Sequence, residues 1–186
     1  MKKLSSFIFL CSVAALSASA QKYTTAKPRP AEWADRPVVH PVPPEFAKEP
    51  AIMLLNEFSL DYRVEGKSFN MYSTEHRLIK VLDDRGIETY NTLDIPVYSG
   101  TRVPSIKART ILPNGKVKEI AQDMILVTKN PHGYWSIIIA MEGVEKYSEI
   151  EYIIKEIHNA DYFGSYTFQY DIPVLETHFH RSESVV

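Results

Sequence analysis

The chain has 186 residues, of which 45% are hydrophobic and 24% are charged; this supplies the core of one ordinary domain and is too short for two full-sized ones. Its formal net charge is −2, and it contains no block of Lys or Arg residues. It therefore lacks the electrostatic footprint that binding to nucleic acid or to an anionic membrane surface requires.

Residues 1–20 have the pattern of a secretory signal peptide. Lys2 and Lys3 form a basic start, residues 7–16 form an apolar stretch too short to span a bilayer, and an Ala-Ser-Ala sequence supplies the small residues that signal peptidase needs. We expect cleavage before Gln21, export to the periplasm or the extracellular space, and no transmembrane segment after cleavage.

Cys11 is the only cysteine of the chain, and it would leave with the signal peptide. The mature chain would then have no disulfide, no thiolate metal site and no cysteine nucleophile. A lipoprotein signal is the alternative, but Leu10 precedes Cys11 where lipoprotein processing needs a small residue.

A proline-rich lead-in follows over residues 21–50. Proline fixes φ and removes a backbone N–H, so this segment cannot run through a helix or a central strand. We expect an extended, polyproline-like segment that docks partly on the domain through Trp33, Val38 and Val39. The alternative is a ligand segment for the aromatic groove of a partner. The segment holds seven of the twelve prolines: Pro28, Pro30, Pro37, Pro41, Pro43, Pro44 and Pro50.

Residues 51–186 show the pattern of a β-domain. Short runs rich in β-branched and aromatic residues alternate with polar residues at a period of two, as at Phe58, Leu60 and Tyr62. The same alternation recurs at residues 106–112, 150–154 and 166–170. A last strand is expected over residues 174–181.

Two turn signals separate these runs, at residues 83–86 and 113–115, and both are expected to be hairpin-type turns. No stretch has a sustained helical period, and the nearest, residues 119–127, is short and β-branched. The sequence therefore predicts an all-β fold, an antiparallel β-sandwich or a strongly bent sheet of about eight to ten strands.

Four motifs then carry a resemblance to a known family. They lie at residues 75–88, 106–117, 143–152 and 171–175. Together, and in this order, they resemble a bacterial domain of unknown function that lies N-terminal to transglutaminase-like domains in secreted or periplasmic proteins, notably of Bacteroidetes. The resemblance covers roughly residues 50–181.

The resemblance implies a non-catalytic accessory domain that packs on, or presents substrate to, a transglutaminase-like domain absent from this chain. The Cys-His-Asp machinery of such proteins resides in that downstream domain, so no catalytic residue carries over to this chain. A free-standing carbohydrate- or peptide-binding module of the cell envelope is the alternative. The expected partner is the transglutaminase-like domain or another envelope protein.

Aromatic residues supply the candidate ligand contacts. Exposed rings can stack on sugars or grip peptides. The favoured interpretation is that these rings fill the core and cover its open end. The candidates are His132, Tyr134, Trp135, Tyr162 and Phe163.

Histidine spacing suggests a metal site only weakly. His178 and His180 lie two apart in an expected strand, so their side chains leave the same face and could bind a metal with His158 or Asp161. The favoured interpretation is a polar face with Phe179 turned inward, because the spacing fixes no third ligand. We therefore predict no metal and no cofactor.

Catalytic patterns are also weak. Ser136 and Ser165 lack the Gly-x-Ser-x-Gly elbow of serine hydrolases. Glu149 and Glu151 share one strand face that is expected to meet solvent, and the acidic pair at residues 83–84 belongs to a turn, so neither pair is expected to form a glycosidase dyad. The sequence predicts that this chain is not an enzyme.

Overall fold

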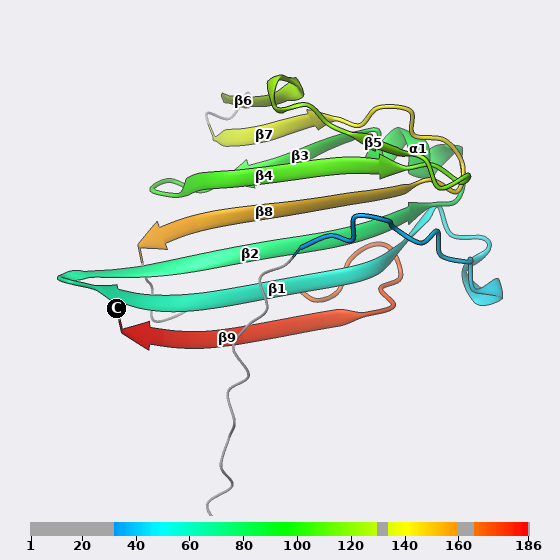
Figure 1. Cartoon of the computed structure of the whole chain (residues 1–186). Coiled ribbons are helices and arrows are strands. Elements are labelled where there is room, and N and C mark those ends of the chain that lie inside the picture. The colour runs from blue at the N-terminus through cyan, green and yellow to red at the C-terminus, as the bar shows by residue number, and fades with distance from the viewer. Residues whose placement is uncertain (1–31, 130–133, 160–165, 186) are drawn as a thin grey trace, which may run out of the picture.

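The computed structural model describes residues 32–129, 134–159 and 166–185, and in them an all-β architecture of two sheets with one short α-helix (Figure 1). The all-β prediction is confirmed, and the nine strands of the described residues lie within the expected number. The larger sheet has the strand order β5-β4-β8-β2-β1-β9. Its strands are β1 (Ala51–Glu65), β2 (Ser68–Val81), β4 (Arg102–Ile111), β5 (Val117–Glu119), β8 (Glu149–Asn159) and β9 (Thr177–Val185).

Neighbouring strands of the larger sheet are antiparallel except at one edge. There β9 pairs in parallel with β1, in a register that aligns Phe58 with Phe179. The expected last strand therefore exists, begins three residues later than predicted, and lies at the edge of the sheet (Figure 1).

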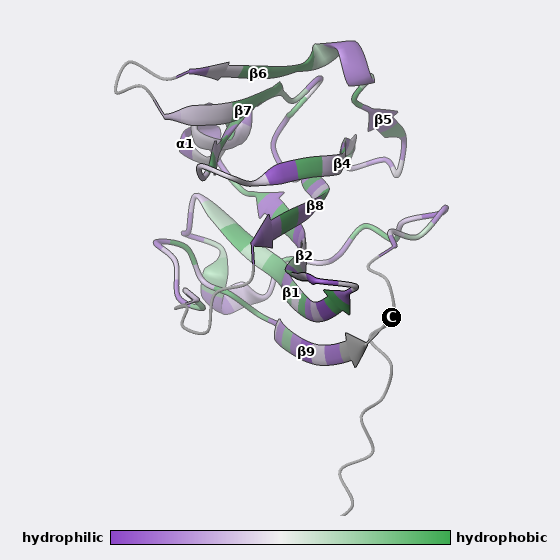
Figure 2. Ribbon diagram, turned by 90° about the vertical axis from the view of Figure 1, so that its left-hand side faces the viewer, coloured by the Kyte–Doolittle hydropathy of each residue, from purple (hydrophilic) through white to green (hydrophobic). Residues whose placement is uncertain are grey.

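The smaller sheet has the order β3-β7-β6 and packs on one face of the larger sheet, here called the inner face (Figure 2). Ile106 and Ala108 of β4, with Ile150, Tyr152 and Ile154 of β8, form one core cluster with residues of the smaller sheet. The alternation predicted for these two strands is confirmed. The strands of the smaller sheet are β3 (Thr92–Val97), β6 (Ile125–Lys129) and β7 (Trp135–Ala140).

The lead-in covers the opposite face of the larger sheet, here called the outer face (Figure 1). Val39, Val42 and Phe46 pack on a second buried cluster made of Ile52, Leu54, Leu78, Leu82 and Ile111. The lead-in is therefore not extended throughout, because Pro44–Phe46 form the 3-10 helix η1, whose first position tolerates a proline.

Two of the three residues expected to dock the lead-in do so. Trp33 lies over the Arg109 guanidinium at 4.4 Å from ring centroid to Cζ, and Val39 packs on the second cluster. Val38 is 73% exposed, because neighbouring side chains of an extended segment point in opposite directions.

The two turn predictions have different outcomes. Residues 113–115 form a hairpin turn between β4 and β5, with Gly115 at φ 79°, as predicted. The prediction for residues 83–86 was wrong, because Asp83 caps the helix α1 (Asp84–Tyr90) by accepting a hydrogen bond from the Gly86 N–H. Residues 119–127 contain the 3-10 helix η2 (Gln122–Met124) and the start of β6.

The prediction of a strand over residues 166–170 was also wrong. The segment has no strand pairing, and its rings pack across neighbouring strands instead. The Tyr166 ring lies 4.7 Å from that of Phe58, and the Phe168 ring lies 5.8 Å from that of Phe179. Phe179 thus lies on the face opposite to the histidines beside it and contacts these rings, but it is 42% exposed and so only partly turned inward.

Candidate functional site

A groove of about 1000 Å³ lies on the inner face, between the smaller sheet and the segment 166–170. This volume is at the upper end of the range of ligand sites. Its floor consists of inner-face side chains of β1, β2 and β8, and one wall is β3. The rings that line it include Phe58, Tyr62, Tyr98, Tyr152, Tyr166 and Tyr170.

Four polar side chains form a cluster on the groove floor that is joined by hydrogen bonds and one ion pair. The Tyr152 hydroxyl donates to Glu75 Oε1 at 3.0 Å, and Arg77 Nε lies 3.0 Å from the same oxygen. Arg77 Nη2 donates to the Tyr170 hydroxyl at 2.9 Å, which in turn donates to the backbone carbonyl of Thr167. The cluster joins β2, β8 and the segment 166–170, so it holds the groove floor and one wall together.

Burial controls the protonation of this cluster. Burial, together with the Glu75 charge, raises the pKa of Tyr152 well above its ordinary value of 10.0. Burial would lower the pKa of Arg77, but the neighbouring Tyr152 and Glu75 raise it. The cluster therefore presents a neutral phenol and a permanent guanidinium to the groove at neutral pH.

We predict that Tyr152→Phe changes how steeply the free energy of unfolding falls at alkaline pH. Below pH 10.0 the phenol is protonated in both the folded and the unfolded chain, so its contribution is fully present. Above that pH the unfolded chain loses the proton first, and the contribution is lost as the pH rises toward the folded pKa. Urea denaturation from pH 8 to pH 11 should show a steeper decline for the wild type than for Tyr152→Phe.

The matched control for this measurement is Tyr98→Phe, whose ring is exposed. Its free energy of unfolding should run parallel to that of the wild type across the same pH range. Equal slopes for the wild type and Tyr152→Phe would contradict the prediction.

A second cluster of polar side chains lies at one end of the groove, where β2, β8 and the loop after β3 meet. Ser73 Oγ lies 3.0 Å from His158 Nε2, and Thr101 Oγ1 lies 3.0 Å from His158 Nδ1. Glu156 Oε2 lies 3.4 Å from both Ser73 Oγ and His158 Nε2. This group could not be predicted from the sequence, because its members come together only through the pairing of β2 with β8.

The geometry of this second group differs from that of a catalytic triad. In a triad the carboxylate holds the histidine nitrogen remote from the serine. Here Thr101 holds Nδ1, while Glu156 approaches the same nitrogen as Ser73 does. Ser73 is also buried. The arrangement offers hydrogen-bond donors, acceptors and a carboxylate to a ligand.

The predicted ligand-contact residues lie away from this groove where they are described. Tyr134 and Trp135, at the start of β7, are 69% and 47% exposed, and neither lines the groove. The Trp135 ring lies 5.1 Å from Lys129 Nζ. His132, Tyr162 and Phe163 lie outside the described residues.

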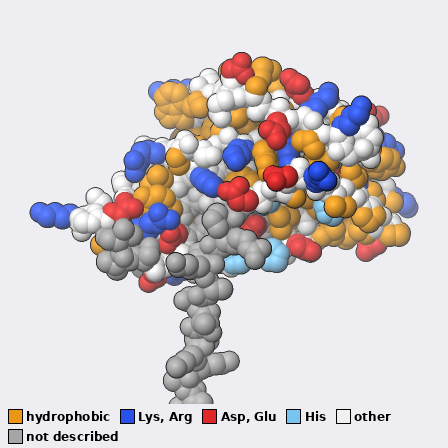
Figure 3. Space-filling view, viewed as in Figure 1, with side chains coloured by type: hydrophobic (Ala, Val, Ile, Leu, Met, Phe, Trp, Pro, Cys, Tyr) orange, Lys and Arg blue, Asp and Glu red, His pale blue; other side chains and the backbone are white. Residues whose placement is uncertain are grey.

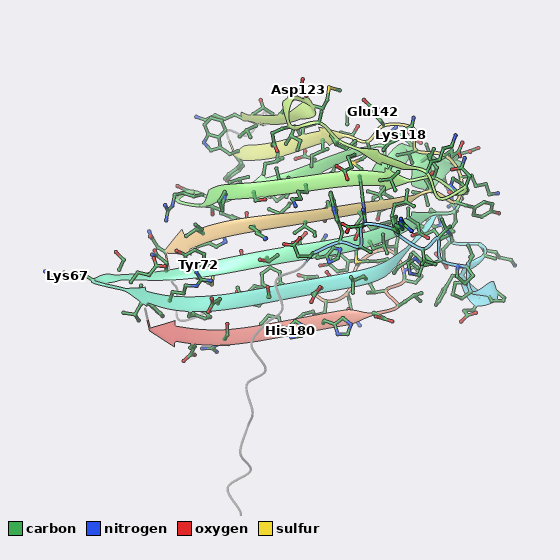
Figure 4. All side chains as sticks on the ribbon, in the orientation of Figure 1. Lys67, Tyr72, Lys118, Asp123, Glu142 and His180 are labelled. Carbon is green, nitrogen blue, oxygen red and sulfur yellow. The ribbon has the colours of Figure 1, made fainter. Side chains whose placement is uncertain are left out.

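The structure brings together only two of the residues considered for a metal site. The rings of His178 and His180 stack at 6.2 Å, and His180 Nε2 lies 3.5 Å from Glu57 Oε1 (Figure 4 labels His180 on β9). His158 lines the groove on the other face, and Asp161 lies outside the described residues. In residues 32–129, 134–159 and 166–185 no group of three His, Cys, Asp or Glu residues is placed to hold a metal ion.

The expectation that Glu149 and Glu151 meet solvent was wrong. Both are buried, with exposed fractions of 0% and 5%, because the lead-in and neighbouring strands cover them. Glu149 Oε1 accepts hydrogen bonds from Lys80 Nζ at 3.0 Å and from the backbone N–H of His40 at 2.7 Å. Figure 3 views this outer face, where acidic and basic side chains are interspersed and histidines gather near the lower edge.

Glu151 has a separate set of buried partners. It accepts a hydrogen bond from Arg109 Nε at 2.7 Å and lies 2.8 Å from His76 Nε2. His76 Nδ1 lies 3.5 Å from Glu57 Oε2. These carboxylates therefore have structural partners instead of forming a glycosidase dyad. Of the two serines considered, Ser136 is buried in β7 and Ser165 lies outside the described residues.

The fold and the groove define an all-β domain with a polar, ring-lined groove between two sheets. The chain is similar in structure to a putative protease from Parabacteroides distasonis ATCC 8503, with a TM-score of 0.57 and 12% sequence identity over 69% of this chain. This similarity shows a shared fold, and the chain spans only 28% of that protein.

Other comparisons add no family. No family model matches the chain, and no curated protein matches it. No helix in the part of the chain that the structure describes is long and apolar enough to cross a membrane.

Proposed function

We propose that this chain is a non-catalytic accessory domain of an exported transglutaminase-like protein, and that its groove presents substrate to the catalytic domain. The observation that carries the proposal is the groove of about 1000 Å³, whose floor combines aromatic rings with fixed polar groups. The similar fold in the putative protease supports it, because there the fold is part of a chain more than three times as long as the matched region.

The chemistry of the groove favours binding over catalysis. Ser73 and His158 are within hydrogen-bond distance, but Thr101 occupies the histidine nitrogen that a triad pairs with its acid. The only thiol of the chain is that of Cys11, in the expected signal peptide. A substrate bound along the groove would be oriented by the rings and polar groups and cleaved or cross-linked elsewhere.

A free-standing binding module is the second candidate. The rings of Tyr62, Tyr98 and Tyr166 on the groove favour it, because aromatic faces stack on sugars as well as on peptide side chains. This module would bind its ligand with the same affinity whether or not a catalytic domain is present. The accessory domain would change the KM of that catalytic domain.

The test compares a transglutaminase-like catalytic domain with and without this chain attached. We expect the attached chain to lower the KM for a polypeptide substrate and to leave kcat unchanged. Tyr98→Ala, which truncates an exposed ring of the groove, should reverse the KM effect. The control is Leu126→Ala, an exposed apolar residue outside the groove.

Two results would contradict the proposal. An unchanged KM on attachment would remove the accessory role. Turnover of amide, ester or glycoside substrates by the purified chain, abolished by Ser73→Ala or His158→Ala, would make the groove an active site.

A further inference from the structure

We propose that the groove binds an extended polypeptide segment bearing Lys or Arg side chains, which pairs as an added strand with the free edge of β3 and places a cationic side chain beside Glu156. The inference deepens the proposed function by naming its substrate class and rests on it. It is carried by the edge of β3 and by the charges of the groove.

The edge of β3 borders the groove. Among the described strands β3 pairs only with β7, so its other edge has no ladder partner there. Thr92, Leu93, Asp94, Ile95 and Pro96 all line the groove. Side chains of a strand alternate between two faces, so five consecutive residues line one cavity only when the strand presents its edge to it.

Pro96 indicates which backbone groups face the groove. Proline has no N–H to give to a ladder, so within a sheet it lies where its nitrogen points away from the neighbouring strand. Pro96 is aligned with Ser136 of β7, so its nitrogen is expected on the groove side. Asp94 and Thr92 lie two and four residues before Pro96, so they direct their N–H and C=O groups to the same side.

These groups recur every second residue, at a spacing of about 6.6 Å, which is the repeat of an extended peptide. A peptide that adds a strand to an exposed edge gains main-chain hydrogen bonds there and uses neighbouring pockets for its alternate side chains. Because Pro96 offers no N–H, the ladder would form at Thr92 and Asp94, and the peptide would continue past Pro96 toward Glu156 at the end of the groove. A saccharide has no peptide backbone and could not form this repeating ladder of main-chain hydrogen bonds.

The groove carries more negative than positive charge. Its carboxylates are Glu75, Asp94 and Glu156, and its only Lys or Arg among the lining residues is Arg77, which is paired with Glu75. Glu156 is near His158, at 3.4 Å, and Asp94 is exposed. Two carboxylates thus face the groove without a Lys or Arg partner from its lining, and a cationic ligand side chain would complement them.

The test uses fluorescence polarisation of labelled heptapeptides and the purified protein. The basic probe is Thr-Lys-Thr-Lys-Thr-Lys-Thr, and the acidic probe replaces each Lys by Glu. A third probe is the basic peptide with alternate backbone nitrogens methylated, which removes the donors that a ladder needs. A chitotetraose probe serves as the saccharide arm. We expect the basic peptide alone to bind in saturable fashion.

Variants separate the contribution of charge from that of the backbone. Glu156→Gln should weaken binding of the basic peptide about tenfold, through loss of one charge-assisted hydrogen bond. The matched control is Glu142→Gln, an exposed carboxylate outside the groove, near Lys118 at the other edge of the molecule (Figure 4). Asp94→Asn removes a charge only, whereas Asp94→Pro also removes the groove-side N–H, so Asp94→Pro should bind more weakly than Asp94→Asn.

The outcomes discriminate between this inference and the proposed function. Equal binding of the basic, acidic and methylated peptides, or no binding of any peptide, would overturn the inference. Binding of chitotetraose in place of the basic peptide would overturn it and favour the free-standing carbohydrate module. The accessory role itself is decided separately, by whether the attached chain lowers the KM of a catalytic domain for a polypeptide substrate.

Discussion

Glu151→Ala is expected to lower the free energy of unfolding by about 3–5 kcal/mol, because it leaves the buried Arg109 guanidinium without its counter-charge and the buried His76 without this hydrogen-bond partner. Arg109 and His76 both reach Glu151, at 2.7 and 2.8 Å, and all three side chains are buried. In the alanine variant the Arg109 guanidinium would keep its desolvation penalty and lose its carboxylate. Breaking one side of a buried ion pair costs far more than the intact pair contributes.

Urea denaturation of Glu151→Ala and the wild type measures this effect. The control is Glu142→Ala, whose exposed carboxylate should change stability by no more than about 0.5 kcal/mol. A double variant, Glu151→Leu with Arg109→Met, removes both charges at similar volume and should recover most of the loss. A loss below about 1 kcal/mol for Glu151→Ala would mean that water reaches the network.

The lead-in explains how such charges are buried on the face of a sheet. Trp33 covers the Arg109 guanidinium, and His40 donates its backbone N–H to Glu149. His40 Nδ1 also lies 3.0 Å from Glu149 Oε2. The proline-rich segment is therefore a structural layer over the outer face, and its extended form lets it cross several strands in few residues.

The alternation of the strands could be predicted from the sequence, but what covers each face could not. The period of two correctly places Ile150, Tyr152 and Ile154 on one face of β8, and it places Glu149 and Glu151 on the other. Whether that second face meets solvent depends on His40, more than 100 residues away in sequence. A local pattern contains no information on such a contact.

The candidate site was missed for a similar reason. Ser73 and His158 are 85 positions apart in the sequence, and only the register of β2 with β8 brings them together. The alternation placed Phe58, Tyr62 and Tyr152 in strands, but the candidate ligand contacts were sought in loops, and the groove is lined by rings of the sheet face instead. Short turn signals also proved ambiguous, since the acidic pair at residues 83–84 fits a helix N-cap as well as a hairpin.

The N-cap leads to the second large effect, which is expected at Gly86. In most helices Gly→Ala stabilises by roughly 1 kcal/mol, because alanine loses less conformational entropy on folding. Gly86 is an exception because α1 lies against the backbone at the start of β1: a Cβ there would lie 2.0 Å from the Pro50 carbonyl oxygen and 3.1 Å from Val81 Cγ1. That oxygen also accepts the Leu82 N–H at 2.8 Å, so it cannot move without breaking this bond.

Gly86→Ala is therefore expected to destabilise the protein by about 1–3 kcal/mol, the cost of overpacking a rigid contact, with a sign opposite to that of helix propensity. The clash is with backbone atoms, so no side-chain rotation relieves it. Thermal and urea unfolding measure the effect, and Glu88→Ala, at an exposed position of the same helix, is the control that should stay within about 0.5 kcal/mol of the wild type. If Gly86→Ala were as stable as the wild type or more so, α1 would have to move freely away from Pro50, and the junction between the lead-in and β1 would not be the fixed contact that the distances indicate.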